Sequence, residues 1–187
     1  MTSNIVLIGP IGAGKSTLGG LLAKHLGLPQ WSMDKRRWAY YQEIGYDDAI
    51  AQQKRAQGGW HLQRYWKPFE AYAVERLLSD CENCSASCVI DFGAGHSVYE
   101  DDTLFRRVQQ ALTPYPNVVL LLPSADLAKS ARILRERNSD LPENTHLINE
   151  LFIHHPSNAQ LAKLTIYTVE KTPAESCQEI IDKLGLA

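Results

Sequence analysis

The segment from Gly9 to Thr17 constrains this chain more than any other. It reads Gly-Pro-Ile-Gly-Ala-Gly-Lys-Ser-Thr and satisfies every fixed position of the pattern G-x-x-x-x-G-K-[ST]. In that pattern the glycines let successive backbone N–H groups converge on a polyphosphate, and the lysine places a positive charge beside the β- and γ-phosphates. The segment therefore predicts a nucleotide-binding site.

The flanking sequence supplies the two elements that such a loop needs. Residues 4–8 form a short β-branched, apolar run that is typical of a strand buried on both faces. After the loop, leucines recur at helical spacing up to Leu26, and Gly27 with Pro29 signals the helix end. The N-terminus of that helix would point at the phosphates.

We assign the loop to ATP with Mg²⁺. The residues expected to contact the nucleotide are Gly9, Gly12, Ala13, Gly14, Lys15, Ser16 and Thr17. The hydroxyl of Ser16 stands where such sites coordinate magnesium, and Thr17 offers a hydroxyl near the α-phosphate.

Composition limits the partners of this chain. Its 187 residues, 44% of them hydrophobic, suit one domain over residues 1–187. A net charge of -2 gives no field that would gather nucleic acid or an anionic membrane. The sequence shows neither a secretory signal pattern nor an apolar run of about 20 residues. We therefore expect a cytoplasmic protein that acts on a small molecule.

Strand-like and helix-like segments alternate along the chain. Apolar or β-prone segments follow the first strand at residues 30–33, 88–90, 118–122 and 164–168. This alternation predicts an α/β protein of the P-loop NTPase fold, with a central parallel sheet of about five strands and helices on both faces. Residues 35–80 and 135–160 are longer than simple connections, and we interpret them as an acceptor-binding region and a lid.

Asp91 ends one of the apolar segments. An aspartate there is typical of the second acidic motif of P-loop proteins, which holds magnesium, often through water. The alternative is that its carboxylate bonds only to loop amides. Three cysteines, Cys81, Cys84 and Cys88, also suggest a metal site, but a fourth nearby ligand is missing and we favour no metal there.

The order of motifs resembles the shikimate kinase family, within the P-loop kinases related to nucleoside monophosphate kinases. The similarity is strongest over residues 12–29, where Gly-Ala-Gly-Lys-Ser-Thr-Leu-Gly leads into Leu-Leu-Ala-Lys-His-Leu-Gly-Leu-Pro. The resemblance implies an ATP- and Mg²⁺-dependent phosphotransferase with a hydroxyl acceptor.

The resemblance also implies an acceptor site. Asp34 matches the family's aspartate at the acceptor hydroxyl, as orienter or base, while Ser32 replaces the metal-side aspartate. The alternative for Asp34 is a helix N-cap. The other matching positions are Lys67 in place of a carboxylate-binding arginine, the loop of Gly93, Ala94 and Gly95, and His154 or His155 at a second arginine position.

Basic residues near the lid complete the expected site. The family's adenine site maps onto Arg132 and onto the Thr172-Pro173 turn. We assign Arg137 to the transferring phosphoryl group; the alternative is a solvated basic helix end, which would suit the helix dipole.

Two other functions remain open. All four tryptophans, with several tyrosines and basic residues, lie within residues 31–72, which would suit a nucleoside or nucleotide as acceptor unless the rings form core. The chain would instead be an ATP-binding switch if it lacked a small-molecule acceptor.

Overall fold

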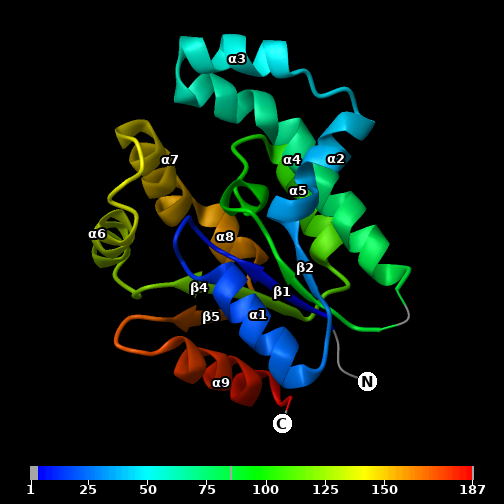
Figure 1. The fold of residues 1–187 in the computed structure, drawn as a ribbon, viewed down its shortest axis with the longest axis vertical. Coiled ribbons are helices and arrows are strands. Elements are labelled where there is room, and N and C mark those ends of the chain that lie inside the picture. Colours follow the sequence, from blue (N-terminus) through cyan, green and yellow to red (C-terminus); the bar gives the residue numbers. More distant parts are fainter. Residues whose placement is uncertain (1–3, 85, 187) are drawn as a thin grey trace.

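The computed structural model describes residues 4–84 and 86–186, and a parallel β-sheet lies at its centre (Figure 1). Its strands are β1 (Ile5–Ile8), β2 (Gln30–Ser32), β3 (Val89–Asp91), β4 (Asn117–Leu122) and β5 (Leu164–Tyr167). The five strands lie in the order β2-β3-β1-β4-β5. This sheet, covered by helices on both faces, confirms the predicted fold class.

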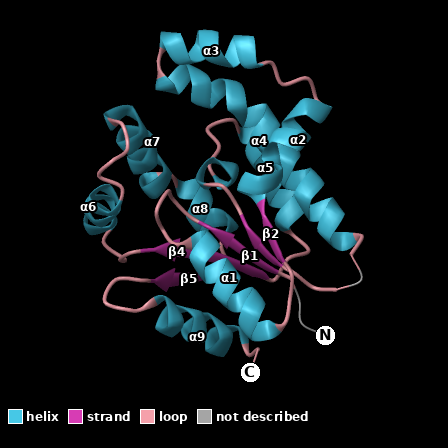
Figure 2. Cartoon of the chain, in the orientation of Figure 1, coloured by secondary structure: helices cyan, strands magenta, loops and turns pink. Residues whose placement is uncertain are grey.

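Helices follow the strands and cover the sheet (Figure 2). They are α1 (Lys15–Leu26), α2 (Met33–Glu43), α3 (Asp48–Gln57), α4 (Gly59–Glu82), the short 3-10 helix η1 (Ala94–Ser97), α5 (Asp102–Leu112), α6 (Leu127–Arg137), α7 (Glu143–His154), α8 (Pro156–Leu161) and α9 (Pro173–Leu184). The expected acceptor-binding region contains α2 and α3 with most of α4, and the expected lid contains α7.

Successive side chains of β1 point to opposite faces of the sheet, which explains the unbroken apolar run. Ile5 and Leu7 join a core cluster with residues of α1 and α9. Val6 and Ile8 join a larger cluster on the other face, with residues of α4 and α5. All four side chains are fully buried.

Parallel pairing brings the functional loops to one edge of the sheet. Asp91 is the register partner of Leu7 in β1 and of Ser32 in β2. The loops that follow β1, β2 and β3 therefore start side by side at the carboxyl ends of the strands, where open α/β sheets bind ligands. Figure 1 shows α2, α3 and α4 on one side of this edge and α6 and α7 on the other.

Capping groups explain several helix ends. Thr172 and Glu175 form a capping box at the start of α9. Gly27, the end signal read from the sequence, ends α1 in the left-handed conformation, and Gly185 ends α9 in the same way. The Asp126 carboxylate accepts the N–H groups of Ala128 and Lys129, so α6 begins at Leu127.

The described part of the chain contains no helix with the length and apolar character needed to cross a membrane. All four cysteines are unpaired, and no cluster of three or more His, Cys, Asp or Glu side chains within residues 4–84 and 86–186 could hold a metal ion.

Candidate active site

The phosphate loop lies between β1 and α1. Gly9 has φ 141°, and a Cβ there would lie 2.5 Å from the carbonyl oxygen of Leu121, so only glycine fits. Gly14, with φ 92°, precedes the first residue of α1. The Lys15 ammonium folds back over the loop and donates to the carbonyl oxygens of Gly9 at 2.7 Å and Pro10 at 2.8 Å.

Asn149 of α7 clamps this loop, which the sequence did not predict. Its Oδ1 accepts the N–H of Ile11 at 2.7 Å, and its Nδ2 donates to the carbonyl oxygen of Ile11 at 3.1 Å. The side chain of Asn149 is buried. One residue of the expected lid therefore fixes the backbone conformation of the phosphate loop.

Asp91 joins three elements at the expected magnesium position. Its Oδ1 accepts hydrogen bonds from Ser16 Oγ at 2.9 Å and from Ser32 Oγ at 3.0 Å. Gln30 Nε2 donates to Asp91 Oδ2 at 2.8 Å and to the carbonyl oxygen of Ser16 at 3.1 Å. The carboxylate thus bonds to side chains of α1 and β2, and Gln30 is a positioning residue that sequence reasoning missed.

These groups fit a magnesium ion. Mg²⁺ prefers oxygen ligands and in nucleotide sites commonly uses one or two protein oxygens, with phosphate oxygens and water completing the shell. Ser16 is exposed, and its hydroxyl already touches Asp91. The pair Ser16 and Asp91, predicted separately from the sequence, is therefore in direct contact.

Burial changes the acidity of the loop lysine. Desolvation lowers the pKa of Lys15 to about 8, against the opposing effects of the carboxylates of Asp34 and Asp91. Both carboxylates therefore lie close enough to the ammonium to raise its pKa. A phosphate group would add a stronger negative charge and favour the protonated lysine.

Asp34 lies in the first turn of α2, beside the loop after β3. Ser32 occupies the N-cap position of this helix, so the N-cap alternative for Asp34 was wrong. The Asp34 carboxylate pairs with Arg37 at 3.5 Å and is 55% exposed. A Cβ on Gly93 would lie 3.0 Å from Asp34 Oδ1, so glycine allows this close approach.

His96 packs behind Gly93. It is fully buried, its Nε2 lies 3.2 Å from the hydroxyl of Tyr41, and its Nδ1 has no hydrogen-bond partner among the described residues. Burial lowers the pKa of His96 to about 4, and the cations of Arg37 and Lys67 act in the same direction. The imidazole is therefore neutral at pH 7.

Lys67 is already paired. Its ammonium donates to Glu70 Oε2 at 2.6 Å and to the carbonyl oxygen of Gly95 at 2.9 Å. Burial is the largest single effect and would raise the pKa of Glu70, but the charge and hydrogen bond of Lys67, together with other positive charges nearby, outweigh it and hold that pKa below its ordinary value. The position that resembles a carboxylate-binding arginine thus carries a neutralised cation, joined to the expected glycine loop.

The nucleotide side of the site contains a cavity of about 210 Å³. Ala13, Gly14, Thr17, Arg137 and Pro173 line it, together with four other residues. The hydroxyl of Thr172 serves the capping box of α9. The structure therefore brings Arg137 to the phosphate loop and the proline turn.

Arg132 lies elsewhere on α6. It lines a second cavity, of about 240 Å³, with Asn149 and His154 of α7. Neither Pro173 nor the phosphate-loop glycines line that cavity. The assignment of Arg132 to adenine therefore stays a prediction.

The neighbouring residues His154 and His155 lie in different surroundings. His154 lines the cavity at Arg132, whereas His155 Nδ1 accepts the N–H of Ser157 at 3.2 Å at the start of α8. Burial lowers the pKa of His155, the charge of Glu100 opposes this, and the charge of Lys67 adds to it. His155 is therefore within electrostatic range of Lys67. Its contact with an acceptor remains a prediction.

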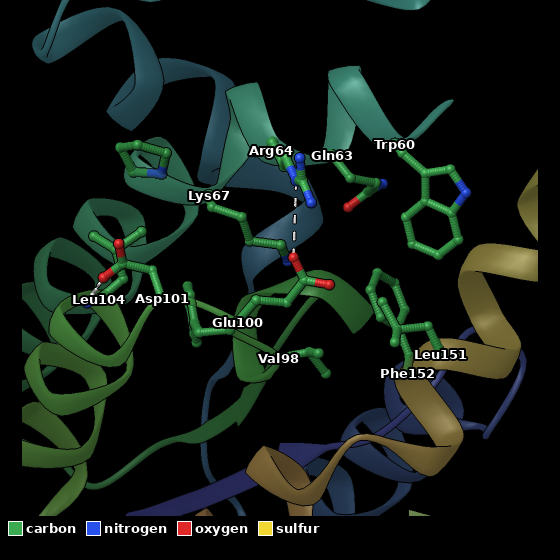
Figure 3. Close-up of a pocket in the computed structure, with 12 residues that line it drawn as sticks. Trp60, Gln63, Arg64, Lys67, Val98, Glu100, Asp101, Leu104, Leu151 and Phe152 are labelled. Carbon is green, nitrogen blue, oxygen red and sulfur yellow. Dashed lines mark hydrogen bonds and ion pairs between the residues drawn. The ribbon is translucent and has the colours of Figure 1, made fainter. Parts of the chain in front are cut away.

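Most rings of the acceptor-binding region pack on one another. Trp38 lies 5.4 Å from Tyr41, 5.5 Å from Tyr46 and 6.3 Å from Trp66, measured between ring centroids. Tyr41 and Tyr46 are buried in the core, whereas Trp38 packs on them and stays 44% exposed. Trp60 is similarly exposed, at 46%, and lines a cavity (Figure 3).

This arrangement is typical of P-loop kinases that act on small molecules. The phosphate loop lies near the carboxylate of Asp34, and a carboxylate can take the proton of a hydroxyl group. Comparison with known proteins narrows the class. No family model matches the chain. However, the shikimate kinase of Pseudomonas fluorescens (strain Pf0-1) is 30% identical over 187 residues, covering 97% of this chain and 96% of that protein. The chain belongs to the shikimate kinase family and is an ATP-dependent small-molecule kinase.

Solved structures agree on the fold. Shikimate kinase from Acinetobacter baumannii in complex with shikimate has a TM-score of 0.67 at 20% identity, with 100% of this chain and 94% of that chain covered. A gluconokinase from Sinorhizobium meliloti 1021 has a TM-score of 0.60 at 17% identity, with 98% and 92% covered. The same fold therefore occurs in kinases named for different acceptors.

Proposed function

We propose that this chain binds ATP and Mg²⁺ at the phosphate loop and transfers the γ-phosphoryl group to a hydroxyl group held at Asp34. The observation that carries the proposal is the convergence of Lys15, Asp34 and Asp91 at the carboxyl ends of β1, β2 and β3. Membership of the family supports ATP and magnesium as its cofactors.

Each residue has a separate role. Ser16 and Asp91 would hold magnesium, which neutralises phosphate charge when bound. Lys15 leaves the carbonyl oxygens of Gly9 and Pro10 and meets the β- and γ-phosphates. Arg137, beside Thr17 in the nucleotide cavity, adds positive charge as the lid closes.

Asp34 orients the acceptor and receives its proton. The acceptor oxygen attacks the γ-phosphorus, the bond from that phosphorus to the β,γ-bridging oxygen breaks, and ADP leaves. Arg37 holds the Asp34 carboxylate at 3.5 Å. Gly93 leaves room for the acceptor beside that carboxylate, and His155 would contact its far end.

The aromatic rings give the nucleoside-kinase alternative less support than the sequence suggested, because Tyr40, Tyr41 and Tyr46 are buried in the core. Exposed aromatic surface remains at Trp38 and at Trp60, and Trp60 lines a cavity. Shikimate, named in the relatives, is the first acceptor to test.

The test is acceptor-dependent phosphorylation, followed by mass spectrometry of the acceptor and by ADP release. The panel contains shikimate, gluconate and nucleosides, with and without Mg²⁺. Lys15→Met should lower the rate by about 100-fold or more, as for loss of one charge-stabilising group. Lys24→Met is the matched control, because Lys24 is exposed on the same helix. Tight ATP binding without any phosphorylated acceptor would favour the switch alternative.

A further inference from the structure

The cavity between α6 and α7 lies apart from most of the proposed ATP and acceptor residues. It has a volume of about 240 Å³, and the two helices that form it pack side by side (Figure 1). Of the residues considered above for ATP, magnesium or the acceptor, only Arg132 and His154 line it. Ligand pockets commonly have volumes of about 300–1,000 Å³, so a ligand of this cavity would be small.

Positive charge enters this cavity from α6. Arg132 and Arg135 lie three residues apart on one face of the helix, and both line the cavity. Arg135 forms an exposed ion pair with Glu143, whereas Arg132 has no ion-pair partner within residues 4–84 and 86–186. Glu150 of α7 is the single acidic residue among the nine that line the cavity. The guanidinium of Arg132 is therefore free to bind a carboxylate or phosphate, which it can hold with two parallel hydrogen bonds.

His146 adds a polar group from α7. It lines the cavity and is 9% exposed, and its imidazole has no hydrogen-bond partner in the described part of the chain. Its ring nitrogens still have accessible surface, unlike the closed-off atoms Gln63 Oε1 and His96 Nδ1. A neutral imidazole carries one N–H donor and a protonated imidazole carries two. A ligand that displaces solvent from His146 must therefore offer an acceptor, or leave this donor unpaired.

Small apolar side chains complete the wall. Ala128 and Ala131 of α6 and Ile153 of α7 line the cavity beside the polar groups. A short hydrocarbon stem would pack on these side chains. The arginines disfavour a cation in the same space, because they outnumber the one carboxylate. The lining therefore suits a small organic anion with acceptor oxygens at one end.

Asn149 connects this cavity with the phosphate loop. It lines the cavity one turn after His146, and its amide makes the two hydrogen bonds to Ile11 described above. The cavity exists while Asn149 holds Ile11. A ligand that bridges Arg132 on α6 and His146 on α7 therefore favours this arrangement of the two helices, and with it the clamped phosphate loop.

We propose that the cavity between α6 and α7 is an effector site for a small organic oxyanion, a carboxylate or a phosphate ester, and that its occupation strengthens nucleotide binding through Asn149. Arg132 and His146 are the main contacts of the oxyanion. The inference rests on the proposed function in one respect, since the phosphate loop must bind the nucleotide. It gives Arg132 a ligand other than adenine.

The first experiment tests the site without turnover. Succinate, a dicarboxylate, and glycerol 3-phosphate, a phosphate ester, are titrated separately into protein labelled with ¹³C at the histidine rings, at constant pH and ionic strength. The His146 signal is assigned from His146→Gln. We expect a saturable shift of this signal with at least one probe, and the probe that binds more tightly identifies the oxyanion. No saturable shift with either probe overturns the site.

Two controls locate the bound probe. Arg132→Ala should weaken its binding about tenfold or more, and because Arg132 is exposed the substitution leaves the core intact. Arg106→Ala should bind the probe as the original protein does, since Arg106 is exposed on α5 and does not line the cavity. Each titration is repeated with Mg²⁺ and the ATP analogue AMP-PNP on the protein. Equal binding in Arg132→Ala, or a shift that AMP-PNP abolishes, would place the probe elsewhere and overturn the site.

The effector role has its own readout. Calorimetric titration with AMP-PNP and Mg²⁺ is made with and without the probe at saturation. Coupled sites commonly change each other's affinity by about fivefold or more, so we expect the Kd for AMP-PNP to be at least about fivefold lower with the probe, and AMP-PNP to tighten probe binding by the same factor. Asn149→Ala should remove this difference. Asn144→Ala should keep it, because Asn144 is exposed on α7 and lies outside the cavity lining.

Two results would overturn the effector role: a Kd for AMP-PNP that the probe leaves unchanged or raises, and an equal decrease of that Kd in Asn149→Ala. Neither experiment involves a phosphoryl acceptor. A failure of the proposed phosphoryl transfer is therefore distinguishable from a failure of this site.

Discussion

Asn149 and Ile11 are held together by two hydrogen bonds, although 138 residues separate them in the chain. The side-chain amide satisfies both the N–H and the carbonyl oxygen of the loop residue. This contact connects α7 with the phosphate loop, so movement of α7 must also change the loop that would hold the nucleotide.

Loss of the Asn149 amide should loosen the phosphate loop. Two neutral hydrogen bonds at about 0.5–1.5 kcal/mol each predict a Kd for ADP about tenfold higher in Asn149→Ala. Isothermal titration calorimetry measures this change. Asn144→Ala is the control, since Asn144 is exposed on the same helix; an equal effect in both variants would contradict the role of the clamp.

Nucleotide binding should weaken as the pH rises through about 8, because Lys15 of the free protein loses its proton there. Bound phosphate favours the charged lysine, so binding takes up a proton in this range. Calorimetry at pH 8.5 in two buffers of different ionisation enthalpy measures the uptake. Lys15→Arg should abolish it, because arginine stays charged; unchanged uptake in that variant would assign the proton to another group.

Stability should fall in mild acid because of His96. Its pKa in the folded protein, about 4, lies below the value of 6.5 expected when unfolded, so the unfolded chain binds more protons between these values. Between pH 7 and pH 5 this single group should lower the free energy of unfolding by about 2 kcal/mol. Urea unfolding at both pH values should show a smaller decrease for His96→Gln. Equal decreases would mean that other groups cause the acid sensitivity.

Lys67 and Glu70 should be strongly coupled. Removing one partner of a buried ion pair costs about 3–5 kcal/mol, so Lys67→Met and Glu70→Gln should each destabilise strongly, and the double variant should lose much less than the sum. The exposed pair Arg64 and Glu100 is the control, with a coupling of about 1 kcal/mol or less. Additive effects of the two substitutions would show that Lys67 and Glu70 do not neutralise each other.

Local patterns in the sequence were sufficient for much of this protein. The phosphate loop, the end of α1 and the five strands depend on residues that are close in the chain, so their conformational preferences can be recognised from local sequence alone. Ser16 and Asp91 were also predicted, because each stands at a characteristic position relative to a strand or helix.

Tertiary structure decided how distant segments meet. Only pairing of β2 with β3 places Gln30 and Ser32 on Asp91, and only docking of α7 brings Asn149 to Ile11. The rotation of α6 turned Arg137, rather than Arg132, toward Pro173.

Packing also separated buried rings from exposed ones. Tyr41 and Trp60 belong to the same aromatic segment of the sequence, yet Tyr41 is buried in the ring cluster and Trp60 is exposed and lines a cavity. The sequence by itself was enough to predict the nucleotide site, because phosphate binding uses one continuous loop, from Gly9 to Thr17. The expected acceptor residues needed the tertiary structure, because Asp34, Lys67 and Gly93 lie on segments far apart in the chain and come together only when these segments pack on the sheet.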